Sequence, residues 1–401
     1  MGNINYIIFL MKSKILILLL LFSTFTQLYS SETKIYLATI GPGDDIFLRW
    51  GHFAIVVDYP EKKDLLFDYG NFSFSQDEFV PNFIKGIMTY LKLRKSADYE
   101  LRAYTLENRD IILQELNLTP KQVDIYIEKL LNEVKPENRY YQYDHYYNNC
   151  VSQMSDFLDN LTDGEFYKGT SKLTGRSFRD LSRDYVSSNY LYNTLIMFVL
   201  GSKVDYNITQ KESMFLPDYT AKRADEVYIS NGNGGKKPLV RDKIILNRSK
   251  GRDPVIVNAK PKVVLNLIIG SILALISLGL SRFRKVSNIM QVLVGLIFGL
   301  AGSLLFFMSF FTEHYYIHNN WNLIMINPLT ISLFISGVLK LTKRFKNLGY
   351  RISSLYIDST LLLIAFMLVL KATGLIVQGN GEIIALIAPL YLVNSSFKLL
   401  R

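Results

Sequence analysis

The sequence predicts an α+β domain outside the cytoplasm, followed by an all-α membrane domain of about five transmembrane helices. Three observations predict this order. An uncharged run over residues 15–22 follows two lysines near the start of the chain, which is typical of an export signal. Residues 31–261 mix short strand-like and helical patterns with many tyrosines and charges. From residue 262 onward, long apolar runs dominate the sequence.

These shifts in composition divide the chain. Residues 1–30 are expected to form a signal peptide or an N-terminal signal anchor, residues 31–261 the extracytoplasmic domain, and residues 262–401 the multi-span domain. Apolar runs of about 17–25 residues are long enough to cross a bilayer. Spans are expected at Val263–Leu280, Ile289–Phe311, Asn322–Val338, Tyr356–Leu370 and Ile383–Phe397.

The placement of basic residues orients these spans. Lys and Arg cluster after the first, third and fifth predicted spans, whereas loops 312–320 and 374–382 contain neither. By the positive-inside rule the odd-numbered spans end in the cytoplasm, so residues 31–261 are expected on the outer side. The net charge of +10 comes largely from the cytoplasmic loops and therefore does not indicate a nucleic-acid partner.

The strands of the outer domain are marked by the turns between them. A Gly- and Pro-rich turn at 41–45 follows the predicted strand Lys34–Ile40. Phe53–Asp58 and Leu65–Tyr69 are expected to pair through the connection 59–64, which contains a proline. Further strands are expected at Tyr99–Leu106, Lys243–Leu246 and Val255–Val257.

The helices are marked by capping signals and apolar spacing. Thr119, Pro120 and Gln122 stand where a helix places its cap, its first residue and the partner of a capping box. The apolar stripe that follows has helical spacing. Other helices are expected at Glu78–Leu93, Phe178–Val186 and Leu191–Leu200.

Cys150 is the only cysteine in the 401 residues. One thiol cannot form an internal disulfide in an exported domain. It follows Asn148 and Asn149, and the apolar residues after it recur at helical spacing, so it stands where an amphipathic helix begins. Unpaired backbone N–H groups and the helix dipole favour a thiolate at this position, which predicts a nucleophile. The alternative is a buried structural cysteine.

His52 is the candidate general base for this thiol. It lies in an apolar strand directly after Gly51, a residue that allows another backbone to approach closely. The alternative is a core histidine with its hydrogen bonds satisfied. Asp68, on the following predicted strand, is the candidate third member that orients the imidazole, with Asp58 and Asp45 as rivals.

Two further residues near the thiol are expected to be structural or to lie on the surface. Asp144 and His145 adjoin Cys150 in sequence, but the direction of their side chains does not follow from the pattern. No His, Cys, Asp or Glu residues of the outer domain stand at a strong ligand spacing, so no metal is expected. No cofactor is expected either.

The loop Thr312–Asn322 concentrates two of the four histidines beside aromatic residues. It either contacts a lipid headgroup or substrate beneath the active site, or forms an aromatic belt with solvated histidines. The candidate substrate-binding residues are Asn149 and Trp50 beside the thiol and base, and His314 and Asn322 in this loop.

The order of His52 before Cys150 is similar to that of the circularly permuted, NlpC-type papain-like enzymes, a group that includes the lecithin:retinol acyltransferases. From about residue 32 to 401 the chain resembles the Lnb-type bacterial lipoprotein N-acyltransferases. The matching pieces are Trp50-Gly51-His52, Asp68-Tyr69-Gly70, Asn148-Asn149-Cys150, Arg176-Ser177-Phe178-Arg179, Leu200-Gly201 followed by Asp205, Phe215-Leu216-Pro217-Asp218, and the segment from His314 to Asn327-Pro328-Leu329.

The resemblance implies a permuted papain-like domain in which Cys150 and His52 are catalytic. It implies transfer of an acyl chain from a membrane phospholipid, through a thioester on Cys150, to the α-amine of the diacylglyceryl-cysteine of a lipoprotein. It also implies a multi-pass protein of the bacterial inner membrane whose catalytic domain faces the periplasm. The alternatives are a membrane-bound phospholipase or thioesterase with the same dyad, a murein peptidase, and a non-enzymatic sensor of lipid or envelope.

Overall fold

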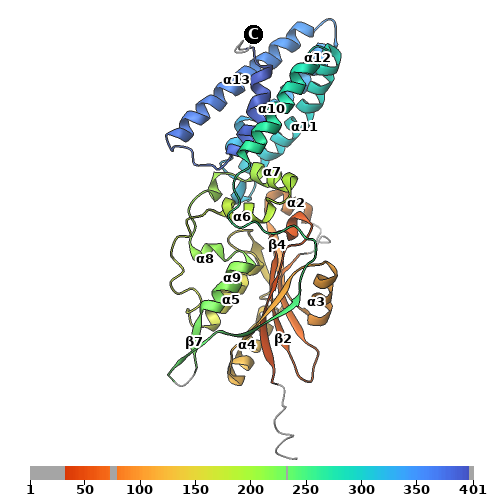
Figure 1. Cartoon of the computed structure of the whole chain (residues 1–401). Helices are drawn as coiled ribbons and strands as arrows, with labels where there is room; N and C mark the ends of the chain where they lie inside the picture. The colour runs from red at the N-terminus through yellow and green to blue at the C-terminus, as the bar shows by residue number, and fades with distance from the viewer. Residues whose placement is uncertain (1–31, 73–78, 232–233, 397–401) are drawn as a thin grey trace, which may run out of the picture.

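The computed structural model describes residues 32–72, 79–231 and 234–396. A domain of mixed helices and strands is followed by a bundle of long apolar helices, as the sequence predicted (Figure 1). The predicted signal segment, residues 1–30, lies outside the described residues.

The first domain is built on an antiparallel sheet in the order β6-β4-β3-β2-β1-β5-β9. Its strands are β1 Lys34–Ile40, β2 His52–Asp58, β3 Leu65–Asn71, β4 Met88–Ser96, β5 Ile111–Leu116, β6 Tyr140–Tyr143 and β9 Val240–Asn247. A separate pair joins β7 Tyr228–Ser230 to β8 Lys236–Pro238.

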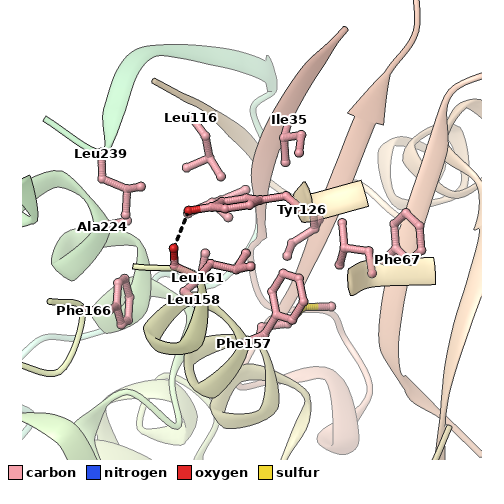
Figure 2. Close-up of a cluster of buried hydrophobic side chains, with 14 of the residues drawn as sticks. Ile35, Phe67, Leu116, Tyr126, Phe157, Leu158, Leu161, Phe166, Ala224 and Leu239 are labelled. Carbon is pink, nitrogen blue, oxygen red and sulfur yellow. Dashed lines mark hydrogen bonds between the residues drawn. The ribbon is translucent and has the colours of Figure 1, made fainter. Parts of the chain in front are cut away.

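Helices cover both faces of the sheet because its central strands are apolar on both sides. Alternate side chains of β1, such as Ile35 and Leu37, pack against α4 (Pro120–Glu133) and α5 (Cys150–Leu161). Figure 2 shows this core, in which the Tyr126 hydroxyl donates to the Leu161 carbonyl at 2.8 Å. The other face of β1 packs against α3 (Ala97–Leu106).

The predicted helix Glu78–Leu93 is wrong in part, and the predicted strand Tyr99–Leu106 is wrong over its whole length. Helix α2 spans Phe79–Lys85 only, and the chain then enters β4, which pairs with β3. Residues 97–106 form α3 because their inward apolar residues stand at helical spacing, whereas Leu106 is exposed. The first error comes from the pairing of β4 with β3, which a local pattern does not reveal.

The other predicted elements of this domain are mostly present. Thr119 forms the expected capping box with Gln122 at the start of α4. Two helices, α6 Phe178–Val186 and α7 Tyr190–Val199, form as predicted, and β9 contains Lys243–Leu246. The strand expected at Val255–Val257 is wrong, since this segment lies outside every described strand. The shorter elements are η1 Ile46–Leu48, η2 Ser202–Val204, α8 Gln210–Ser213 and α9 Pro217–Glu226.

Among the described residues, four helical segments are long and apolar enough to cross a membrane: α10 Val263–Leu280, α11 Arg284–Phe311, Trp321–Leu341 and α13 Lys346–Ala372. The third consists of η4 Trp321–Ile324, η5 Pro328–Thr330 and α12 Ile331–Leu341. The fifth predicted span corresponds to α14, Gly381–Asn394, whose 14 residues fall short of the ~20 that cross a bilayer.

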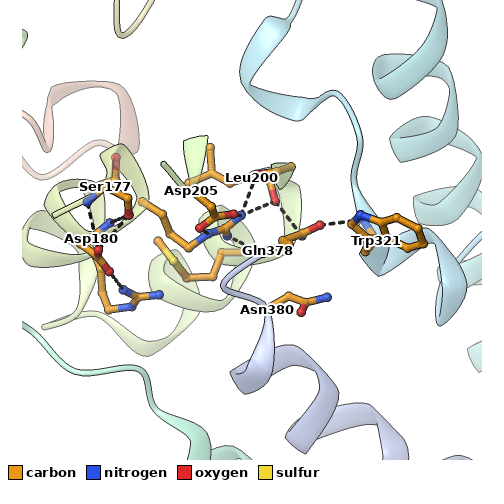
Figure 3. A network of polar contacts seen from close by, with 12 residues as sticks. Ser177, Asp180, Leu200, Asp205, Trp321, Gln378 and Asn380 are labelled. Atoms are coloured by element: carbon orange, nitrogen blue, oxygen red, sulfur yellow. Dashed lines mark hydrogen bonds and ion pairs between the residues drawn. The ribbon is translucent and has the colours of Figure 1, made fainter. Parts of the chain in front are cut away.

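The sheet domain sits on the outer end of this bundle, with α6, α7 and α2 nearest to it (Figure 1). Gly201, just after α7, donates its backbone N–H to the Tyr316 carbonyl at 2.8 Å. A Cβ at Gly201 would lie 2.0 Å from the His318 carbonyl oxygen, so only glycine fits this contact. Gln378 adds a second tie, because it donates to the Leu200 carbonyl and accepts from the Trp321 N–H (Figure 3).

Candidate active site

Cys150 is the first residue of α5, and Asn149 is its N-cap. The Asn149 side-chain oxygen accepts from the backbone N–H groups of Val151 and Ser152, both at 2.9 Å. This cap leaves the Cys150 N–H without a hydrogen bond to any of the described residues. The helix start therefore presents a thiol and a free backbone donor side by side.

His52 begins β2 and brings its ring to the thiol. Its Nδ1 lies 3.2 Å from the Cys150 Sγ. Gly51, with φ +76°, makes the sharp entry into this strand, and a Cβ there would lie 2.7 Å from the Ile40 carbonyl oxygen. The close backbone approach expected at Gly51 is therefore present.

Asp68 holds the other side of the imidazole. It lies on β3, and its Oδ1 is 2.9 Å from the His52 Nε2. The same oxygen accepts from the Gly70 N–H at 2.8 Å. The rivals are placed elsewhere: Asp58 ends β2 at the opposite end from His52, and Asp45 caps η1. The geometry thus brings Asp68, and neither rival, to the His52 ring.

A lysine that the sequence did not single out completes this set. Lys95 Nζ lies 2.9 Å from the Asp68 Oδ2. It was missed because residues 78–93 were predicted as a helix, whereas β4 actually pairs with β3 and brings Lys95 beside Asp68. The register of a neighbouring strand is the signal that would have found it, and this register does not follow from local spacing.

The charges of the site reinforce one another. Burial by itself lowers the pKa of His52, but the negative charges of Cys150 and Asp68 raise it to about 10. Burial by itself raises the pKa of Asp68, but His52 and then Lys95 hold it below its usual range. The arrangement therefore favours an ionised carboxylate and a protonated imidazole beside the sulfur.

This geometry fixes which imidazole nitrogen faces the thiol. An ionised carboxylate only accepts hydrogen bonds, so the His52 Nε2 carries the proton that points to Asp68. The Nδ1 then faces Cys150 and can take or return its proton. A thiol, a base and an orienting carboxylate in this order are the groups that nucleophilic acyl chemistry needs.

His145 packs beside this site as a neutral ring. Its ring centroid lies 4.6 Å from that of Trp50, and Tyr316 lies 6.4 Å away. Burial lowers the pKa of His145 to about 4. Asp144 instead shapes the turn before α5, because its Oδ1 accepts from the Tyr146 and Tyr147 N–H groups. Both contacts agree with the structural roles expected for these two residues.

The four candidate substrate-binding residues are placed differently. Asn149 is occupied by capping and by its donation to the carbonyls of His145 and Phe215. Trp50 lies against His145, and its buried Nε1 finds no hydrogen-bond partner among the described residues. Trp50 is thus the one of these two side chains with a hydrogen-bond donor left unused near Cys150 and His52.

The two loop residues support the docking of the domains. His314 is buried, and its Nδ1 lies 3.2 Å from the Tyr316 hydroxyl. Asn322 is fully buried, donates to the Phe198 carbonyl at 2.8 Å and accepts from Asn380. The bond from Asn322 to Phe198 holds the loop against the sheet domain, and no hydrogen bond joins either side chain to Cys150 or His52 within the described residues.

The same loop places the thiol close to the membrane bundle. Its short helix η3, Tyr315–Ile317, packs Tyr316 against Tyr146, with ring centroids 5.8 Å apart. Tyr146 lies four residues before Cys150 in the turn that leads into α5. The fold and the site together define a membrane-embedded protein with a cysteine–histidine–aspartate arrangement at the outer end of its helices.

Comparison with known families agrees with this class. Residues 23–184 match the family model of the Lnb N-terminal periplasmic domain, and residues 254–400 match that of the Lnb transmembrane domain. The two matches follow each other along the chain and together cover most of it, so the chain belongs to the Lnb family. Searches of curated proteins and of solved structures gave no match.

Membership confirms the resemblance seen in the sequence. It makes this a membrane protein with a periplasmic domain and points to an acyltransferase-type enzyme. Residues 23–184 contain the whole Cys150, His52 and Asp68 arrangement.

Proposed function

We propose that this protein is a lipoprotein N-acyltransferase of the bacterial inner membrane that works through a thioester on Cys150. One observation carries the proposal: the Cys150 Sγ lies 3.2 Å from the His52 Nδ1, in a turn packed on the outer end of the membrane bundle. Asp68 is the orienting member of the site. The acyl donor is a membrane phospholipid, and the acceptor is a diacylated lipoprotein.

In the first half-reaction the Cys150 thiolate attacks the carbonyl carbon of a phospholipid ester. The carbon–sulfur bond forms, and the bond to the glycerol oxygen breaks. The His52 imidazolium gives its proton to the departing alkoxide, and a lysophospholipid leaves. A raised pKa of His52 suits this step, because the imidazolium is already present at neutral pH.

In the second half-reaction the α-amine of the lipoprotein's modified cysteine attacks the thioester. Free α-amines have pKa values near 8, so a usable fraction is unprotonated at neutral pH. Neutral His52 takes the proton that the nitrogen loses, the carbon–sulfur bond breaks, and the thiolate–imidazolium pair is restored. The product carries an amide-linked third acyl chain.

Both half-reactions pass through a tetrahedral oxyanion, which needs a hydrogen-bond donor. The backbone N–H of Cys150 is suited to this role, because the Asn149 cap occupies the next two N–H groups and leaves this one free. The positive end of the α5 dipole lies at the same place.

The position of the site favours lipid substrates. Both proposed substrates are confined to one leaflet, and their reacting groups lie near the headgroups. A thiol held at that level by the η3 contact replaces a three-dimensional search with a search in the plane of the membrane. A murein peptidase would not need a bundle of this size as an anchor.

The direct test is the mass of the intact protein after incubation with phospholipid vesicles and no acceptor. The expected result is one acyl adduct on Cys150, released by hydroxylamine as thioesters are. The matched control is Ser155→Ala, which removes a buried hydroxyl from the same helix without touching the site. Absence of an adduct under conditions where lipoproteins are acylated would overturn the thioester route.

The second test separates a transferase from a hydrolase. Diacylated lipoprotein is added to the vesicles, and its N-terminal peptide is analysed by mass spectrometry. The wild type is expected to add one acyl chain, and Cys150→Ala to add none. Release of free fatty acid with no change in the peptide would instead identify a phospholipase or thioesterase.

A further inference from the structure

Helix α7 belongs to the sheet domain but lies across the outer ends of the membrane helices (Figure 1). At its start, the Tyr190 hydroxyl donates to the Asn266 side-chain oxygen at 3.0 Å, and Asn266 is the fourth residue of α10. Near its end, the Phe198 carbonyl accepts from Asn320 and Asn322. Both ends of α7 are thus tied at the depth where the spans begin.

The two faces of α7 differ. Asn193 and Met197 are fully buried, and Asn193 donates to Glu382 at the start of α14. Leu191 and Leu195, on the opposite face, are 60% and 46% exposed. Because residues four apart share one side of a helix, these leucines form a continuous apolar strip pointing away from the junction.

A third exposed apolar residue, Phe47, lies beside this strip. Tyr192, next to Leu191 on α7, donates its hydroxyl to the Asp44 carbonyl at 3.4 Å. Asp44 leads into η1, whose central residue Phe47 is 79% exposed. Arg49 fixes this turn to the corner between α6 and α7 by donating to Ser188 at 2.9 Å. From Phe47 the chain reaches His52 within five residues.

Phe47, Leu191 and Leu195 form what we call the apolar edge. Exposed apolar side chains at this depth continue the lipid-facing surface of α10, where Leu267, next to Asn266, is also exposed. Water contact there would cost free energy that lipid contact removes. The acyl chains of the outer leaflet are therefore the partner that this surface is expected to contact.

We infer that the apolar edge inserts into the outer leaflet and is where a phospholipid acyl chain leaves the bilayer on its way to Cys150. The insertion stands on the exposure and the contacts of α7 and η1 alone. The route to the thiol rests on the proposed function. It explains why an apolar, exposed turn immediately precedes the strand that carries the catalytic base.

Insertion can be tested without any catalysis, because Cys150 is the only cysteine. In a Cys150→Ser background, Phe47→Cys and Leu195→Cys each give one site for an environment-sensitive fluorophore. The matched control is Ile125→Cys, since Ile125 is 40% exposed on α4, at the end of the domain far from the bundle (Figure 1). The labelled full chains are reconstituted in vesicles with bromine on the lipid tails.

Quenching by the brominated tails at positions 47 and 195, but not at 125, is the expected result. Equal emission from all three positions with brominated and ordinary lipid would overturn the insertion. Loss of quenching at high protein density would assign the edge to a second copy of the chain and would overturn it as well. None of these outcomes depends on acyl transfer.

The route is tested with Phe47→Ser and Leu195→Ser in the active protein. Transfer from vesicle phospholipid is expected to fall about tenfold, while the rate at which iodoacetamide alkylates Cys150 stays unchanged, because the thiol and its base are intact. Ile125→Ser is expected to match the wild type in both assays. Unchanged transfer in the edge variants would overturn the route even if the edge inserts.

Discussion

Two buried charged clusters lie in the same domain and use their hydrogen bonds differently. At the junction with the bundle, Arg179 makes two bonds to Asp205, at 2.7 and 2.9 Å, and three to the carbonyls of Met197, Leu200 and Gly201. At the candidate active site, Asp68 is equally saturated by His52, Gly70 and Lys95. The sulfur of Cys150, in contrast, has only the His52 ring as a hydrogen-bonding partner among the described residues.

The difference separates a cluster suited to holding a fold together from one suited to chemistry. A buried ion whose hydrogen bonds are all made is stable and inert. A thiol with a single proton-exchanging partner and a free backbone N–H beside it is instead arranged to react with an electrophile. The four predictions below test whether this contrast is correct.

The largest effect is expected from removing the base. His52→Ala leaves Cys150 without a partner for its proton, so acyl transfer is expected to fall by about 10³-fold or more. Alkylation of Cys150 by iodoacetamide at neutral pH is expected to be slower than in the wild type, because the partner that exchanges a proton with the thiol is lost. Both rates are measured on protein in vesicles. An unchanged rate of alkylation would contradict the role of the His52–Cys150 contact.

The next largest effect is expected from Asp68→Asn. This change should slow acyl transfer by roughly 10²-fold. The carboxylate helps to raise the pKa of His52 to about 10. Its loss lowers that pKa, so the imidazolium loses its proton earlier, and the alkaline limb of the pH–rate profile is expected to move to lower pH. The profile is measured from pH 5 to 10, and an alkaline limb at the wild-type position would contradict the assignment.

The matched control is Asp58→Asn, since Asp58 lies on β2 at the end opposite His52. It is expected to leave both the rate and the pH–rate profile unchanged.

The stability of the fold is also expected to depend on pH, through the protonation of His52. The folded pKa of His52 lies above its ordinary value of 6.5, so its protonation stabilises the wild-type fold fully below pH 6.5, and this contribution is lost as pH rises through about 10.

The pair of His52 and Cys150 could be predicted from the sequence for a physical reason. A lone thiol at a helix start and a histidine after a glycine each carry a local signature. The strand that carries Asp68 was also predicted, and on it Asp68 lies 2.9 Å from the His52 Nε2. The order of the two domains could also be predicted from the sequence. Membrane spans are recognised by the length of their apolar runs, because that length is set by the thickness of the bilayer.

Long-range pairing could not be predicted in this way. Lys95 reaches Asp68 only through the register of β4 against β3, and the segment 78–93 has apolar spacing compatible with a helix. The role of Asn322 was also hidden, because its partners, Phe198 and Asn380, come from distant parts of the chain. A single sequence carries no signal for contacts of that kind.

The third prediction concerns the saturated cluster. Arg179→Met leaves the carboxylate of Asp205 buried without its partner, which is expected to cost about 3–5 kcal/mol of stability. The rate of Cys150 alkylation in the folded fraction is expected to stay the same. The control is Lys168→Met, which removes an exposed ion pair with Glu165 and is expected to cost much less stability than Arg179→Met. Thermal unfolding in vesicles measures both, and equal losses would show that the junction does not depend on Arg179.

The smallest effect is expected where the two domains touch without charges. In Gly201→Ala the new Cβ would lie 2.0 Å from the His318 carbonyl oxygen, so the η3 loop must move away. This overpacking is expected to cost about 1–3 kcal/mol and to lower transfer from vesicle lipid more than alkylation of Cys150. The same substitution at Gly279, where nothing lies within 4 Å, is expected to be neutral or slightly stabilising. If Gly201→Ala lowered both rates equally, the junction would be shaping the thiol itself, and the separation between holding and reacting clusters would fail.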